Sequence, residues 1–91
     1  MAKLYKTNGE IIEVSPKNGS DYTLSELQDF VQGELIEIIL LDTEEMMIVN
    51  EEGKLNNLPF NENATKLWKQ HFGETDFIVG NVLVCKQDEV L

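Results

Sequence analysis

The centre of the chain reads ELIEIILLDTEEMMIVNEEGKLNNLPFN over residues 34–61, and this stretch decides the fold. Two apolar runs, residues 34–41 and 46–49, flank a short acidic break. Each run is apolar on both of its alternating faces, a pattern typical of strands in the middle of a sheet that is covered on both sides. Residues 51–54 then predict a turn, and a further short strand around Leu55 is expected to pair back on residues 46–49.

The segment before this centre predicts a hairpin and a helix. Asn-Gly within residues 7–9, between two short alternating runs, is a strong hairpin signal because Gly accepts positive φ readily. A loop over residues 15–21 follows. Thr23 and Glu26 have the spacing of a capping box, which predicts a helix that ends at Gly33.

The segment after the centre predicts a second helix and a last strand. Asn61 or Asn63 can cap the helix, whose apolar residues fall at helical spacing up to Phe72. Residues 77–85 predict the final strand region, which is interrupted at Gly80-Asn81. The tail from Gln87 is expected to fray.

The predicted order is ββαβββαβ, an α+β fold with a small, mainly antiparallel sheet and two helices. The length of 91 residues suits one domain over residues 1–91, with an ordered core over about 2–86. The central strands are apolar on both faces. We therefore expect either that the helices lie on opposite faces or that a second copy of the chain covers one face as a homodimer.

Composition excludes several classes of function. The net charge is −10, and residues 34–53 hold seven acids and no base, so nucleic-acid binding is not expected. No apolar run is long enough for a membrane span. The single cysteine, Cys85, excludes an internal disulfide and fits a cytoplasmic protein.

No residue pattern in the chain predicts catalysis, a cofactor or a metal. The acids between Asp42 and Glu52 lack the spacing of a calcium loop, and solvated surface is the simpler interpretation. His71 and Cys85 would need to meet in the fold to act as a nucleophilic pair, whereas a helix-end histidine and a small buried thiol explain them more simply. Trp68 is most simply a core residue. We therefore expect a non-enzymatic protein.

Five segments together resemble a known bacterial and phage family, domain of unknown function 3846. They are residues 30–33, 36–38, 49–55, 58–61 and 78–84. The Asn-Glu-Glu-Gly-Lys-Leu turn within 49–55 is the most specific of them. No activity is attached to this family, and its frequent occurrence on phages, plasmids and conjugative elements implies an accessory protein of a mobile genetic element. The chain departs from the pattern at Glu62, where many members carry Arg, so an anion-binding role is not expected there.

These observations favour a small acidic interaction module with a protein partner. Two alternatives stay open: a DNA-mimicking inhibitor of a host defence protein, suggested by the acidic block, and a small-molecule-binding domain. The candidate partner or ligand surface consists of polar residues at and near the signature turn: Asn50, Glu51, Glu52, Lys54, Asn61 and Asn63.

Overall fold

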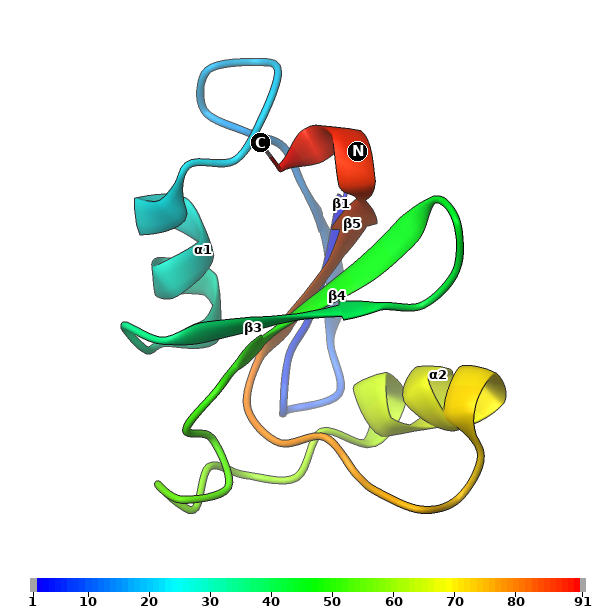
Figure 1. Ribbon diagram of the computed structural model, residues 1–91. Coiled ribbons are helices and arrows are strands. Elements are labelled where there is room, and N and C mark those ends of the chain that lie inside the picture. The colour runs from blue at the N-terminus through cyan, green and yellow to red at the C-terminus, as the bar shows by residue number, and fades with distance from the viewer. Residues whose placement is uncertain (1, 91) are drawn as a thin grey trace.

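A computed structural model describes residues 2–90 and shows a five-stranded sheet with two helices (Figure 1). The elements are β1 Ala2–Tyr5, β2 Ile11–Val14, α1 Leu24–Val31, β3 Ile36–Leu40, β4 Glu45–Asn50, α2 Glu62–Phe72, β5 Val82–Lys86 and the 3-10 turn η1 Gln87–Glu89. Every strand pairing is antiparallel, and the order across the sheet is β2-β1-β5-β4-β3. The predicted α+β fold with an antiparallel sheet and two helices is confirmed.

Local sequence signals place the first hairpin and α1 as predicted. The Lys6 amide donates to the Glu10 carbonyl at 2.8 Å, and Gly9 between them has a φ of 95°. At the start of α1, the Thr23 hydroxyl accepts from the Glu26 amide at 3.2 Å, while the Glu26 carboxylate accepts from the Thr23 amide at 3.0 Å. This reciprocal pair satisfies two backbone donors that would otherwise lack a partner in the first turn.

The end of α1 is shaped by a close approach to β4. Gln32, not Gly33, adopts the left-handed conformation there, with a φ of 59°. Gly33 lies against the side chain of Asn50, and a Cβ built on it would be 2.4 Å from the Asn50 amide nitrogen. That nitrogen donates to the carbonyls of Val31 and Gln32. Gly33 is therefore needed for this contact more than for helix termination.

The two helices lie on opposite faces of the sheet (Figure 1), which confirms one of the two predicted ways of covering it. Leu27 and Val31 of α1 pack with Ile48 and Leu83 in one core. Ala64 of α2 belongs to the other core, whose sheet residues include Met47, Val49, Val82 and Val84. Neighbouring residues of β4 and β5 thus supply both cores, as the period of two in a strand requires.

The prediction that residues 34–41 form a middle strand is wrong, because β3 is an edge strand. The middle position belongs to β5, which joins the β1–β2 hairpin to the β3–β4 hairpin. β4 is interior and buried from Met46 to Asn50, whereas Ile38 and Leu40 of β3 are exposed. The pattern of apolar residues correctly indicated that β3 contacts both cores. It could not indicate that β3 has a neighbouring strand, β4, on one edge only.

Two further segments differ from the prediction. Residues 51–57 form successive turns, and Leu55 is 76% exposed, so no strand forms there. Within residues 2–90, the segment that connects β4 to α2 makes a single β-bridge, from Phe60 to Val79. The segment beyond β5 is ordered over residues 87–90, where fraying was predicted. It forms η1, and the Tyr22 amide donates to the Glu89 carbonyl at 2.7 Å.

Candidate functional site

A pocket of about 370 Å³ lies between the edge strand β3 and helix α2. Glu37 and Ile39 of β3 line it on one side, Trp68 and Phe72 of α2 on another, and the loop that follows α2 closes it with residues 76–79. We call it the β3–α2 pocket. Its volume falls at the lower end of the range for ligand sites.

Three aromatic side chains line this pocket: Trp68, Phe72 and Phe77. The rings of Trp68 and Phe72 have centroids 5.2 Å apart, and the ring of Phe77 lies 6.2 Å from that of Phe60, which is outside the lining. Trp68 packs against the α2-side core, whereas Phe72 and Phe77 are exposed. Such half-covered aromatic rings are characteristic of surfaces that bind a partner.

The charges around the pocket are only partly paired. Lys54 donates to the Asp76 carboxylate, and its Nζ lies 4.5 Å from the centre of the Phe77 ring. The hydrogen bond from Lys54, followed by the bond from the Phe77 amide, holds the pKa of Asp76 below its usual value. Within residues 2–90, the carboxylates of Glu37 and Glu51 have neither a hydrogen bond nor an ion pair. The pocket therefore has a surplus of negative charge.

Three of the predicted site residues meet at this pocket: Asn50, Glu51 and Lys54. Glu51 and Lys54 are exposed there, and Lys54 is already paired with Asp76. The Asn50 amide is already used by α1, and its Oδ1 accepts from the Glu52 amide at 2.9 Å. Glu52 is exposed but does not line the pocket.

Asn61 and Asn63 lie away from the pocket and have structural contacts. Asn61 is the N-cap of α2, where its Oδ1 accepts from the Ala64 amide, and its Nδ2 donates to the carbonyls of Tyr5 and Gly80. Asn63 donates to the Gly9 carbonyl at 3.1 Å. The three predicted asparagines therefore hold backbone segments together and do not converge on one ligand.

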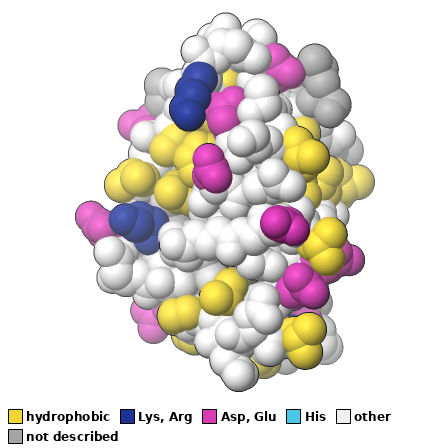
Figure 2. Space-filling model, turned by 90° about the vertical axis from the view of Figure 1, so that its left-hand side faces the viewer, with side chains coloured by type: hydrophobic (Ala, Val, Ile, Leu, Met, Phe, Trp, Pro, Cys, Tyr) yellow, Lys and Arg dark blue, Asp and Glu magenta, His cyan; other side chains and the backbone are white. Residues whose placement is uncertain are grey.

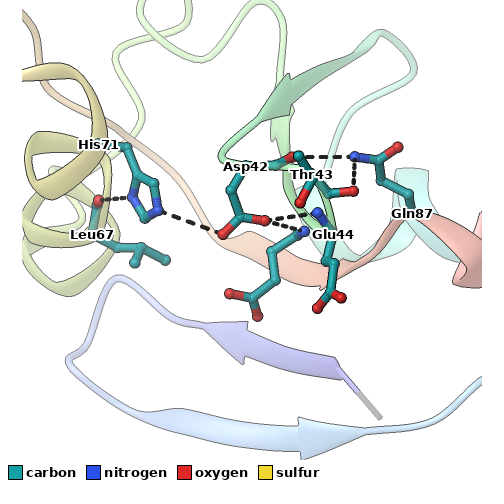
Figure 3. Close-up of polar contacts among 7 residues, drawn as sticks. Asp42, Thr43, Glu44, Leu67, His71 and Gln87 are labelled. Atoms are coloured by element: carbon teal, nitrogen blue, oxygen red, sulfur yellow. Dashed lines mark hydrogen bonds and ion pairs between the residues drawn. The ribbon is translucent and has the colours of Figure 1, made fainter.

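His71 and Cys85 lie on opposite faces of the sheet. His71 Nδ1 is 3.0 Å from the Leu67 carbonyl oxygen, and Nε2 is 3.9 Å from the Asp42 carboxylate (Figure 3). Cys85 is buried in the core beneath α1, and burial raises the pKa of its thiol to about 12. This separation leaves no Cys–His nucleophilic pair.

The seven acids of the acidic block are divided along the β3–β4 hairpin. The pairing of β3 with β4 separates one group at the start of β3 from another at the turn between the strands. The residues at the first end are Glu34, Glu51 and Glu52, those at the turn are Asp42, Glu44 and Glu45, and Glu37 lies between them. Within residues 2–90, no cluster of three or more acidic, histidine or cysteine side chains could hold a metal ion.

Acidification is expected to destabilise the fold in part through Asp42, which caps the β3–β4 turn (Figure 3). Hydrogen bonds from the backbone amides of Glu45 and Glu44, with a smaller effect of His71, hold the pKa of Asp42 below its usual value of 3.8. A carboxyl with a lowered folded pKa stabilises the fold above its unfolded pKa, and this contribution is lost as the pH falls through the folded pKa.

We therefore expect the melting temperature to fall below about pH 4. The fall should be less steep in Asp42→Asn, whose side-chain oxygen can still accept both amides. Thermal melts between pH 7 and pH 3 measure this difference, and equal slopes in the two proteins would contradict the role of Asp42.

A comparison with known protein families finds one family that matches nearly the whole chain. The family described as domain of unknown function DUF3846 matches residues 4–90. The chain belongs to the DUF3846 family. The resemblance noted in the sequence is thereby confirmed. No curated protein and no solved structure matches the chain significantly. Within residues 2–90 of this DUF3846 chain, no helix is long and apolar enough to cross a membrane.

The signature turn of this DUF3846 chain has both structural and surface roles. Gly53 is tightly packed, because a Cβ there would lie 3.0 Å from the Val79 side chain and 3.2 Å from the Asn50 carbonyl oxygen. Glu51 and Lys54 from the same turn line the β3–α2 pocket. The most specific segment of the sequence thus builds one wall of the pocket.

Sequence reasoning missed the aromatic residues and Glu37 as site residues. Trp68 and Phe72 are four residues apart, which predicts a buried helix face equally well. The available signal was that Leu67 and Trp68 are adjacent, so the apolar stripe of α2 is wider than one narrow face. Phe77 and Asp76 carry no local signal, because only the tertiary fold brings their loop beside Lys54.

Proposed function

We propose that this chain is a small, non-enzymatic protein-interaction module that binds its partner at the β3 edge and the adjoining β3–α2 pocket. The observation that carries the proposal is an apolar edge strand, exposed at Ile38 and Leu40, beside a pocket walled by aromatic rings. A free strand edge is a template for pairing with another chain, and exposed aromatic rings favour protein contacts. We further propose a cytoplasmic accessory role on a mobile genetic element, based on the family resemblance and the single free Cys85.

The two alternatives have less support. A DNA mimic would need an ordered array of acids, whereas six of the seven acids in residues 34–53 are divided between the two ends of the β3–β4 hairpin. A small-molecule binder would use convergent polar groups, whereas the amides of Asn50 and Asn61 are occupied by backbone partners. Binding of a small ligand in the β3–α2 pocket can be tested with the same variants that test the protein interaction.

A matched pair of surface variants tests the proposed interaction. Phe77→Ser removes an exposed ring from the pocket, while Leu55→Ser removes an exposed side chain outside it. Tagged wild-type protein and both variants are used to capture proteins, with quantitative mass spectrometry, from cells that naturally encode the chain. We expect wild type and Leu55→Ser to retain the same specific partner and Phe77→Ser to lose most of it. Equal capture by all three proteins, or a substrate turned over by the purified chain, would overturn the proposal.

A further inference from the structure

The backbone of β3 presents a row of unpaired hydrogen-bonding groups. The Glu51 amide donates to the Leu35 carbonyl, and the Leu41 amide donates to the Glu45 carbonyl. Hydrogen-bonded and non-bonded pairs alternate in an antiparallel ladder. Residues at odd positions between these two bonds therefore face β4, and the N–H and C=O groups of Ile36, Ile38 and Leu40 face outward.

This edge lacks the usual protection against pairing. β3 contains no proline, and its register with β4 runs without a bulge from Ile36 to Leu40. Its only charged residue is Glu37. Within residues 2–90, no strand other than β4 pairs with it. Native edge strands are commonly interrupted by proline, lysine or a bulge, so an open edge of this kind is suited to accept another strand.

An added strand would place its alternate side chains in two different environments. Side chains directly opposite Ile38 and Leu40 would lie on the α1 face, beside exposed aliphatic groups. Side chains at the alternate positions would lie on the α2 face, next to Glu37 and Ile39 and over the β3–α2 pocket. Neighbouring strands are about 4.8 Å apart, so these contacts are direct.

The charges select a basic occupant. Residues 34–53 carry seven acids and no base, and the unpaired Glu37 and Glu51 carboxylates lie at the pocket. The nearby rings of Trp68 and Phe72 can receive a cation on their faces. Figure 2 shows the side of the molecule on the left of Figure 1, where α1 lies, with apolar and acidic side chains interspersed and few basic ones. A second copy of the chain is disfavoured because each copy has a net charge of −10 and β3 has no base.

We propose that β3 accepts an extended basic segment of a partner protein as a sixth, antiparallel strand. Its lysine or arginine side chains enter the β3–α2 pocket, and its aliphatic side chains pack on Ile38 and Leu40. This inference rests on the proposed interaction function and specifies the chemistry of the partner. Antiparallel addition continues the pairing of every other strand in the sheet.

The probe is an acetylated and amidated peptide in which four valines alternate with three lysines, titrated into ¹⁵N-labelled protein. We expect the largest amide shifts at Ile36, Ile38 and Leu40 and no binding by the peptide with glutamate in place of lysine. In the proposed register the valine amides bond to β3 and the lysine amides face away. N-methylation of the valines should therefore abolish binding, whereas N-methylation of the lysines should preserve it. Equal binding by both methylated peptides, shifts centred elsewhere, or no binding at millimolar concentration would overturn the inference.

A proline pair tests the same edge from the protein side. Ile38 is 47% exposed and Ile11 of the opposite edge strand β2 is 46% exposed, and both have outward-facing amides. Ile38→Pro should weaken peptide binding at least about tenfold, and Ile11→Pro should leave it unchanged. Glu37→Gln should weaken it about threefold and reduce its salt dependence.

The methylated peptides keep the test decisive if Ile38→Pro fails to fold. A captured partner that depends on Phe77 while the peptide does not bind would overturn only this inference, whereas loss of both would overturn the proposed function as well.

Discussion

Asn61→Ala is expected to lower the free energy of unfolding by about 3–5 kcal/mol. Asn61 is 0% exposed, and its side chain makes one bond to the first turn of α2 and two bonds to the carbonyls of Tyr5 and Gly80. Loss of the cap costs about 1 kcal/mol. The Gly80 carbonyl, whose bond to Asn61 is buried, loses this donor at a cost of about 1–3 kcal/mol, and loss of the part-buried bond to the Tyr5 carbonyl adds about 1 kcal/mol. For a domain of this size, with a total stability of roughly 5–14 kcal/mol, such a loss removes a large share.

The matched control is Asn63→Ala, two positions along the same helix. Asn63 makes one exposed bond to the Gly9 carbonyl, so its removal should cost about 0.5 kcal/mol or less. Urea unfolding followed by circular dichroism measures both variants. A loss of only about 1 kcal/mol for Asn61→Ala would show that Asn61 acts only as a helix cap and does not hold β1 and the segment before β5 to α2.

Leu83→Ala is expected to destabilise the fold by about 3–4 kcal/mol. Leu83 lies in the middle of the central strand β5, where it is opposite Leu4 of β1 and Ile48 of β4, and it is fully buried. Truncation therefore removes apolar contacts from both halves of the sheet and leaves a cavity that the surrounding strands cannot close.

Leu55→Ala is the control for this truncation, because Leu55 lies in the exposed turn and the same atoms are removed. Its effect should stay within about 0.5 kcal/mol. Chemical denaturation with a shared slope gives the two values. A cost below about 1 kcal/mol for Leu83→Ala would contradict the central position of β5.

The sequence predicted well the elements whose signals are local. Gly9 marks the first hairpin, and the spacing of Thr23 and Glu26 marks the start of α1, because both depend on contacts within a few residues. The neighbours of a strand depend on contacts far along the chain. The apolar pattern of β3 could not show that β5 occupies the centre, so the strand was predicted to be covered on both edges.

The candidate site was predictable in part for the same reason. Glu51 and Lys54 belong to a turn with a recognisable sequence, and the structure places both at the pocket. Phe77 reaches the pocket only because Asn61 donates its backbone amide to the Ile78 carbonyl and Phe60 bridges to Val79. Such contacts across the fold leave no periodicity in the sequence.

The central position of β5 has a consequence for biosynthesis. Both hairpins are synthesised before β5. Because β5 is the strand that pairs with both β1 and β4, the two hairpins cannot be joined in one sheet until residues 82–86 have emerged from the ribosome. The nascent chain therefore carries the apolar sides of both hairpins without a closed sheet while residues 51–81 are translated. Distant strand pairings of this kind also slow folding. Closure of the sheet is thus a late step, and the unclosed hairpins are the species that a chaperone or protease would meet.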